Sequence, residues 1–491
     1  MANSSAAAVE AALCQPPNGT RTDTIVIGSG PGGSTAATIL AEAGRQVMML
    51  EEGCYHRQGK FPAFGRAELE ACWRRAGMTV TVGSRPINYV EGCCLGGGSE
   101  VNSGFYHRLP EAVAARWRSH YRVAGLEDES LLQLQEENER DLNIAEAPGA
   151  VQPASQLLAA GAREKGWACR PIKRWHRYDN DYQPLAPGGV RQSMSETFLP
   201  RFGKAGGQIV TGCRVQRITP VTGGWRVQAL VDGREIHYRA GQLVLAAGAV
   251  NTPALLRASG IGNRIGNSLR MHLFARIIAE FDEQVNSPDA GIGPDQIEQF
   301  APRLRLGCAA STPAQLALAL THAAPSWLTS HRQCWQQRAA YYASVSGGRG
   351  WVRMLPGGEP TVFYRISRQA CYDLADGIRY LAAALLAAGA RKVLPVLAGA
   401  PTITSSKQLW QLPRPLPPAK SLLSSVHLMG SCPMGEAGAT DSFGRLPGVS
   451  GLTIADASLF CDSPNLNPQA TVMTLARRNA RYLLENSRSD G

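Results

Sequence analysis

Six residues near the start of the chain, Gly28 to Gly33, form a glycine-rich turn that could hold a phosphate group. Their sequence is GSGPGG, with glycine at the first, third and sixth positions. In a turn between a strand and a helix, the first glycine permits the tight turn, the second lets a pyrophosphate touch the backbone, and the third lets helix and strand pack closely. The helix N-terminus then faces the phosphates with the positive end of its dipole. The residues of this turn predicted to bind a cofactor are Gly28, Ser29, Gly30, Pro31, Gly32 and Gly33.

The sequence on either side of this turn favours a dinucleotide over a mere glycine-rich turn. An apolar run, DTIVI, precedes the turn, and a second apolar run, QVMML, ends at Glu51, about 20 residues beyond it. A carboxylate at that distance can accept a hydrogen bond from a ribose hydroxyl. The turn and Glu51 alone leave the choice between NAD and FAD open.

A second glycine run, Gly96, Gly97 and Gly98, lies far along the chain from the first. Three bare backbone positions in a row permit another close approach by a ligand. A nicotinamide enzyme seldom needs two such loops, whereas a cofactor buried along its whole length does. The alternative, a flexible surface loop, is less favoured because apolar and hydrogen-bonding residues surround the glycines in EGCCLGGGSEVNSGFYHR.

The elements that must position these loops can be read from the hydrophobic pattern. Residues 23–53 read as strand, turn, helix and strand, which is half of a dinucleotide-binding fold. Strand patterns return over 207–248, with a hairpin turn predicted at Asp232-Gly233. Helix-like and strand-like runs alternate over 276–420. Within that region, 316–338 is favoured as a core helix over a membrane-surface or substrate-entry segment.

Length and composition limit the classes of protein to which this chain can belong. A chain of 491 residues with 44% hydrophobic residues suits two globular domains. There is no apolar run of about 18 residues that could span a bilayer. Residues 1–22 lack the pattern of a signal peptide and are predicted to be a disordered leader. The twelve cysteines show no zinc-site spacing, so no metal is predicted, and they suit a reducing cytoplasm.

The formal net charge is +11. The favoured interpretation is a basic surface that aids solubility. The alternative is an acidic partner, such as a carrier protein, a phosphorylated substrate or an anionic membrane face. Nucleic acid is disfavoured because the chain has no dense Lys/Arg run.

Three separated segments resemble the signatures of the glucose–methanol–choline (GMC) oxidoreductases, in family order. They are GCCLGGGSEVNSGFYHR at 92–108, GAVNTPALLRASGIG at 248–262, and the region 426–480, which begins VHLMGSCPMG. The resemblance implies an α/β (overall α+β) fold in which a Rossmann-like FAD-binding domain is interleaved with a substrate domain built on an antiparallel sheet. The implied FAD-binding domain comprises 23–110, 195–275 and 421–491, and the substrate domain comprises 111–194 and 276–420.

The resemblance also implies where FAD would lie. Asn102 would lie beside the flavin ring system, Val215 beside the adenine, and Asp456 and Ala457 near the ribityl chain and pyrophosphate. Some relatives bind the flavin covalently through a histidine at the position that Val101 occupies here, so non-covalent FAD is expected. The remaining residues expected to contact the cofactor are Ala247, Pro468 and Gln469.

A catalytic pair, His427 and Asn467, follows from the third segment. Histidine can take a hydroxyl proton near neutral pH, whereas an amide can orient an alcohol but cannot act as the base. By the match, His427 is therefore the base, and Asn467 pairs with it across the substrate oxygen. Asn467 followed by Pro468 also reads as a helix N-terminus, whose dipole would stabilise the reduced flavin. His272 matches a family position expected to be structural.

The reaction implied by the resemblance is the oxidation of an alcohol to an aldehyde or ketone. The base abstracts the hydroxyl proton, a hydride passes to flavin N5, and dioxygen or another acceptor reoxidises the flavin. The alternatives are a non-redox lyase on the same scaffold, a dehydrogenase with a non-oxygen acceptor, and a non-catalytic flavoprotein, which the presence of both His427 and Asn467 disfavours. The substrate itself cannot be read, because 276–420 carries no motif.

Overall fold

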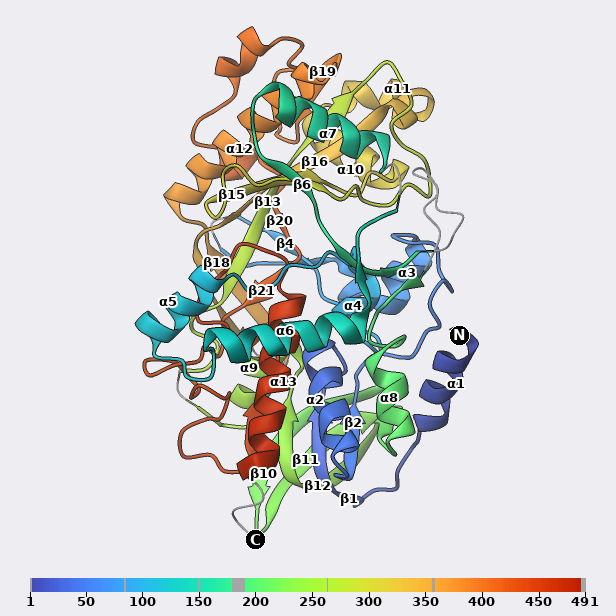
Figure 1. The fold of residues 1–491 in the computed structure, drawn as a ribbon, viewed down its shortest axis with the longest axis vertical. Helices are drawn as coiled ribbons and strands as arrows, with labels where there is room; N and C mark the ends of the chain where they lie inside the picture. Colours follow the sequence, from blue (N-terminus) through green and yellow to red (C-terminus); the bar gives the residue numbers. More distant parts are fainter. Residues whose placement is uncertain are drawn as a thin grey trace.

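Two large sheets organise the molecule, one in each half along its long axis (Figure 1). The structure is a computed structural model, and it describes residues 2–83, 85–148, 151–178, 190–262, 264–355 and 358–486. The first sheet has seven strands and contains the predicted dinucleotide turn. The second has ten strands and lies in the half that holds most of the motif-free region.

The first sheet combines a parallel core with an antiparallel edge. Its order is β10 (Cys213–Val221), β11 (Gly224–Val231), β12 (Arg234–Leu245), β1 (Arg21–Ile27), β2 (Val47–Leu50) and β9 (Gln208–Val210), with β22 (Leu452–Ile454) also paired to β12. Strand β1 runs parallel to β2 and β12, whereas β10, β11 and the first half of β12 form an antiparallel ribbon. Asp232 and Gly233, both at positive φ, close the predicted hairpin.

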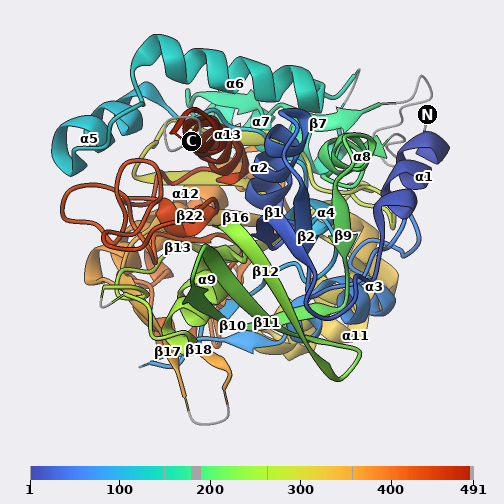
Figure 2. The ribbon, with the colours of Figure 1, turned by 90° about the horizontal axis from the view of Figure 1, so that it is seen from below.

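Both faces of the first sheet are buried, which explains the continuous apolar runs of its central strands. Ile25 and Ile27 of β1 belong to the hydrophobic core on one face and Val26 to that on the other. Figure 2 shows helix α9 (Gly248–Ala258) on one side, and on the other α2 (Pro31–Glu42), α8 (Phe198–Lys204) and α13 (Gln469–Asn486).

The prediction of a disordered leader over residues 1–22 is wrong. Helix α1 (Ala2–Ala12) packs against α8, and Val9 is fully buried in the core beside it. A Cβ at Gly203 of α8 would lie 2.7 Å from the carbonyl oxygen of Ala8, so the missing side chain permits this contact. The small apolar residues of this segment serve as one face of a helix, a pattern that a search for signal peptides does not detect.

The second sheet is mainly antiparallel, as the resemblance implies. Its order is β3 (Thr79–Val80), β4 (Asn88–Tyr89), β20 (Ser424–Ser425), β13 (Arg270–Glu280), β16 (Arg338–Ser346), β15 (Leu304–Cys308), β14 (Asp295–Ile297) and β6 (Cys169–Pro171), with β19 (Lys392–Pro395) and β21 (Leu428–Met429) also paired to β13. Helices α7 (Pro153–Glu164) and α12 (Arg368–Ala387) pack together and cover one face.

Smaller elements complete the fold. The short strands are β17 (Arg349–Met354), β18 (Pro360–Arg365), β5 (Ile144–Ala145), β7 (Arg174–Arg177) and β8 (Val190–Arg191). The remaining helices are α3 (Arg66–Cys72), α4 (Gly98–Val101), α5 (Glu111–Tyr121), α6 (Asp128–Leu142), α10 (Pro313–Ala323) and α11 (Leu328–Cys334), and six short 3-10 helices, η1 to η6, link them. None of the helices among the described residues is long and apolar enough to cross a membrane.

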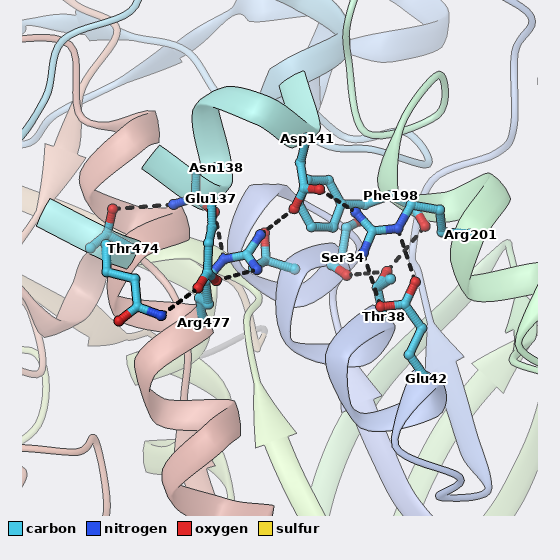
Figure 3. Close-up of polar contacts among 12 residues, drawn as sticks. Ser34, Thr38, Glu42, Glu137, Asn138, Asp141, Phe198, Arg201, Thr474 and Arg477 are labelled. Atoms are coloured by element: carbon cyan, nitrogen blue, oxygen red, sulfur yellow. Dashed lines mark hydrogen bonds and ion pairs between the residues drawn. The ribbon is translucent and has the colours of Figure 1, made fainter. Parts of the chain in front are cut away.

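The domain boundaries differ from the prediction because helices α5 and α6 join the first half. Figure 3 shows Arg477 of α13 bound to Glu137 and Asp141 of α6, and Arg201 of α8 bound to Asp141. Trp117 of α5 is buried in the core of the first sheet. The polar composition of 111–142 is that of two amphipathic helices on the outside of the first half. Of the described residues in 111–194, α7 and β6 join the second sheet, whereas Trp175 packs in the core of the first half.

Three other segments, which the prediction assigned to the FAD-binding domain, belong instead to the second sheet. Strands β3 and β4 (79–89) and β20 and β21 (424–429) belong to the second sheet, and β13 starts at Arg270 rather than after residue 275. The chain therefore crosses from one sheet to the other close to the glycine run and again close to His427. Residues of both sheets lie together at these crossings.

Candidate active site

A cavity of about 1440 Å³ lies between the two sheets. Ligand sites usually measure about 300–1,000 Å³, so this cavity has room for a dinucleotide together with a small substrate. The predicted site residues that line it are Gly28, Ser29, Gly30, Pro31, Gly32, Glu51, Gly97, Gly98, Asn102, Val215, Ala247, His427, Asp456, Ala457, Asn467, Pro468 and Gln469. Two predicted cofactor residues, Gly33 and Gly96, do not line it.

The turn between β1 and α2 has the geometry that its glycines predict. Gly28 has φ +98°, and a Cβ on Gly33 would lie 1.9 Å from the carbonyl oxygen of Gly28, so only glycine permits this packing of helix on strand. A Cβ on Gly30, by contrast, would meet no described protein atom within 4 Å. Gly30 therefore presents bare backbone to the cavity at the N-terminus of α2.

The second glycine run is joined directly to the first. A Cβ on Gly97 would lie 2.8 Å from Cα of Gly30, so the two loops touch backbone to backbone. The Gly96 N–H donates to Oγ of Ser29 at 2.9 Å, and Gly96 (φ +93°) shapes the turn. Gly97 and Gly98 line the cavity, whereas Gly96 does not.

Glu51 lies at the end of β2, as predicted, and ties the first loop in place. Its carboxylate accepts hydrogen bonds from Ser29 N at 2.9 Å, Ser29 Oγ at 2.6 Å and Gly53 N at 2.8 Å. Burial raises the pKa of Glu51, and these hydrogen bonds act against that rise. A carboxylate has about four acceptor positions, so Glu51 retains capacity for a ribose hydroxyl in the cavity that it lines.

The first and third signature segments meet at the start of helix α13. Nδ2 of Asn102 donates to Oε1 of Gln469 at 2.7 Å, and Oδ1 of Asn102 accepts from the Gly104 N–H at 2.9 Å. Helix α13 begins at Gln469, as predicted, and its N-terminus faces the cavity because Pro468 and Gln469 line it. The positive end of an 18-residue helix is thereby directed at the predicted flavin.

Asp456 joins the second and third signature segments. Its carboxylate accepts from Gly248 N at 2.9 Å, from the Thr252 hydroxyl and from Ser458 N at 2.8 Å. Burial raises the pKa of Asp456, opposed by these hydrogen bonds. Asp456 therefore anchors the start of α9 while lining the cavity beside Ala457.

These features fit FAD. Bare backbone at Gly30 and Gly98 lies at the N-termini of α2 and α4, and within 4 Å a hypothetical Cβ on either glycine would meet no atom of the described residues beyond its chain neighbours and its own helix. Such positions suit a pyrophosphate. Glu51 and Val215 lie on the wall where the ribose and adenine are expected, and Asn102 and Gln469 lie on the wall expected for the flavin ring. In the described part of the chain, no cluster of His, Cys, Asp and Glu suits a metal ion.

His427 lies at the boundary between the cavity and the second sheet. Its Nδ1 is 2.9 Å from Nδ1 of His272 on β13, and the two rings meet edge to face with centroids 5.1 Å apart. The ring of Phe274 also contacts it, at 5.8 Å between centroids. Burial, with a smaller effect from His107, lowers the pKa of His427 to about 3, so its imidazole is neutral at physiological pH.

Asn467 contacts a histidine that the sequence reasoning did not single out. Nδ2 of Asn467 lies 3.2 Å from Nδ1 of His107, and Gln296 also hydrogen-bonds the His107 side chain. An amide nitrogen can only donate, so Nδ1 of His107 is the acceptor and its proton is on Nε2. His107 does not line the cavity, and its contact with Asn467 suits it to hold that amide in place. Its place within GFYHR, at the end of the first signature, was the available signal.

Three histidines at or near the cavity, His107, His272 and His427, predict a loss of stability in acid. Burial lowers the pKa of His107 to about 4, of His427 to about 3, and of His272 well below its ordinary 6.5. Their contribution to the free energy of unfolding is complete above pH 6.5. It is lost as the pH falls below 6.5, because only the unfolded chain then takes up these protons. At pH 5 each histidine costs up to about 2 kcal/mol, which corresponds to roughly 2 °C in Tm for a chain of this size.

We therefore expect thermal unfolding of His272→Asn to be less sensitive to acid than that of the wild type. Between pH 7 and pH 5, the Tm of the variant should fall by roughly 2 °C less than that of the wild type. Equal shifts in the two proteins would show that His272 is not held neutral by the fold.

Comparisons with known proteins agree with what the site residues indicate. Residues 69–274 and 356–476 match the family described as GMC oxidoreductase, and residues 21–59 match an FAD binding domain. An uncharacterized GMC-type oxidoreductase of Sinorhizobium fredii is 35% identical over 482 residues, covering 95% of each chain. A long-chain-alcohol oxidase of Arabidopsis thaliana is 25% identical, covering 92% of this chain and 66% of the relative.

Solved structures share the fold. Pyridoxine 4-oxidase from Mesorbium loti superposes with a TM-score of 0.70 at 18% identity, covering 94% of this chain and 99% of the other. A formate oxidase from Aspergillus oryzae RIB40 superposes with a TM-score of 0.72 at 13% identity, covering 96% of this chain and all of the other. The interleaved two-sheet architecture is therefore common to these proteins.

Proposed function

This chain belongs to the GMC oxidoreductase family and is an FAD-dependent oxidoreductase, and on that premise we propose that it oxidises an alcohol to an aldehyde or ketone. The observation that carries the proposal is the His427 imidazole. It lines the cavity, is held from behind by His272, and has a pKa of about 3 that leaves it unprotonated. A neutral imidazole with one free nitrogen can accept a hydroxyl proton.

His272 sets the direction of this base. When Nδ1–H of His427 donates to Nδ1 of His272, Nε2 of His427 keeps its lone pair and can face the substrate. The same hydrogen bond would stabilise the imidazolium formed when His427 takes the proton. His272 is thus a positioning residue for the base, a larger role than the structural one expected from the sequence.

Asn467 and helix α13 complete the machinery. The amide of Asn467 lines the cavity and is held by His107, so it can orient the alcohol oxygen toward His427. When bound, FAD supplies the acceptor for the hydride that leaves the alcohol carbon. The positive N-terminus of α13 would favour the negative charge of the reduced cofactor.

Non-covalent binding of FAD remains part of the proposal. Val101, which lines the cavity next to Asn102, has no nucleophilic atom that could bond to the flavin. Denaturing the purified protein should release all of the flavin into the soluble fraction, and retention on the precipitated chain would contradict this.

The proposed acceptor for reoxidation is dioxygen. The relatives named long-chain-alcohol oxidase and 5-(hydroxymethyl)furfural oxidase, which are 25% and 23% identical to this chain, support an oxidase. A dehydrogenase would reoxidise only with an added artificial acceptor, so the rate of flavin reoxidation in air-saturated buffer distinguishes the two.

The test of the function is anaerobic reduction of the flavin by a panel of primary and secondary alcohols. We expect bleaching of the oxidised flavin spectrum by at least one alcohol, with formation of one carbonyl product per flavin. A lyase on the same scaffold would transform its substrate without bleaching. A holoenzyme that no alcohol in a broad panel reduces would contradict the proposal.

A further inference from the structure

Strand β13 carries an arginine into the cavity on the same face as His272. Side chains on a strand alternate between its two faces, so His272, Phe274 and Arg276 point to one side. Phe274 and Arg276 both line the cavity. From His272 to Arg276 the strand advances about 13 Å, toward the end of β13 that pairs with β19.

The guanidinium of Arg276 has no partner within the described chain. No hydrogen bond or ion pair involves its side chain, and burial alone lowers its pKa, with no neighbouring carboxylate to act against it. Two other arginines of the described chain that expose little surface are paired with carboxylates. Arg338 binds Glu280 with both side chains 2% exposed, and Arg305 binds Glu298 at 2.8 Å.

Arg276 is only partly exposed, on the side that faces the cavity. A charge that loses contact with water without gaining a partner is costly, and chains rarely retain one that nothing offsets. Arg276 opens onto the cavity and not onto another protein group, so the space that an anion would occupy is the substrate end of the cavity. The guanidinium offers a planar fork of N–H donors that matches a carboxylate or phosphate in a bidentate contact.

The surroundings between the base and the arginine are largely apolar. The ring of Phe274 lies between them and packs against His427 and against Tyr342, which is opposite Arg276 in the register of β16. Leu318 of α10, 67% exposed, and Leu422 also line this end. The segment 316–338, predicted as a core helix, thus contributes Leu316 and Leu320 to the core and Leu318 to the cavity wall.

We propose that the substrate is an alcohol whose apolar body carries an oxyanion group, a carboxylate or a phosphate, at the end remote from the reacting carbon, and that Arg276 binds that group. The proposal rests on the proposed function, because it places the hydroxyl at His427. It adds a specificity residue and narrows the substrate class to anionic alcohols several bonds long.

The test compares matched substrates on the FAD-loaded enzyme. Linear ω-hydroxycarboxylates, ω-hydroxyalkyl phosphates and the corresponding 1-alkanols are used to reduce the flavin anaerobically in the wild type and in Arg276→Met. We expect one anionic series to be preferred over the alkanols, and the variant to lose about 100-fold in kcat/KM for that series alone. Whichever anionic series is preferred identifies the group as carboxylate or phosphate.

Three controls separate charge recognition from a structural role. Arg226→Met removes the same charge from an exposed position on β11 and should change nothing. Arg276→Lys keeps the charge but loses the fork, so it should retain part of the preference. The Tm of Arg276→Met should be unchanged or higher than that of the wild type, because the substitution removes a partly buried charge that has no partner in the described chain.

A binding measurement makes the result independent of turnover. Linear dicarboxylates and alkyl phosphates, which lack an oxidisable hydroxyl, should perturb the flavin spectrum of the wild type and bind Arg276→Met about 100-fold more weakly. Equal binding to both proteins, or an equal loss for anionic and neutral alcohols, would overturn the proposal. If no alcohol reduces the flavin but anion binding still depends on Arg276, the proposed reaction fails while the anion site stands.

Discussion

Replacing His427 with asparagine should lower the rate constant of anaerobic flavin reduction by about 10³-fold, the usual contribution of a well-placed general base. Among the described residues, His427 is the only histidine that lines the cavity, and His107 lies outside it with Nδ1 bonded to Asn467. Asparagine preserves much of the volume of the imidazole, so the cofactor should stay bound. Stopped-flow absorbance of the flavin measures the rate, and the flavin-to-protein ratio confirms loading.

The control for this prediction is His120→Asn, which alters an exposed histidine on α5 and should leave reduction unchanged. The pH profile gives a second readout. Because the pKa of His427 is about 3, the wild-type rate should not fall as pH decreases through 6.5. A His427→Asn enzyme that reduces its flavin at the wild-type rate would remove His427 from the mechanism.

The cofactor half of the site could be predicted from sequence because its chemistry depends on backbone. Gly28, Gly30 and Gly97 act through missing side chains, and the absence of a side chain is visible in any sequence. The spacing to Glu51 follows from one strand, one helix and one turn, which have fixed dimensions. Local pattern and local geometry coincide in this part of the chain.

The substrate half could not be predicted, because its residues are brought together by sheet pairing across long sequence separations. His272 and His427 are 155 residues apart and meet only through the pairing of β13 with β21. Arg276 stands in an apolar run, MHLFARIIAE, where a charged residue on the same face as His272 was a readable signal. The Arg276 side chain has no hydrogen-bond or ion-pair partner in the described chain, and this observation, on which the proposed anion site rests, can be made only in the structure.

The domain boundaries fail for a related reason. Helices α5 and α6 carry the polar composition of an external layer, and nothing in that composition says which sheet they cover. The answer lies in Arg477, on the buried side of α13, which is paired with Glu137 and Asp141 of α6 (Figure 3). An arginine in a C-terminal helix does not reveal a partner more than 300 residues earlier.

Replacing Gly30 with valine should abolish tight FAD binding while leaving the fold intact. Gly30 has φ −61° and ψ −178°, a conformation open to any residue, and a Cβ there meets no described protein atom within 4 Å. The added side chain would instead fill the space in which the pyrophosphate must touch the backbone. We expect the Kd for FAD to rise by about 10³-fold, or about 4 kcal/mol, measured by titration of the apoprotein.

Gly33→Ala provides the matched control, because it changes the same turn in a different way. Its Cβ would lie 1.9 Å from the carbonyl oxygen of Gly28, inside the contact between α2 and β1. That substitution should lower the Tm of the apoprotein itself, whereas Gly30→Val should leave it within about a degree of the wild-type apoprotein. If Gly30→Val retained wild-type affinity for FAD, the pyrophosphate would have to lie elsewhere in the cavity. The inferred position of the flavin beside His427, which depends on the pyrophosphate lying at Gly30, would then be unsupported.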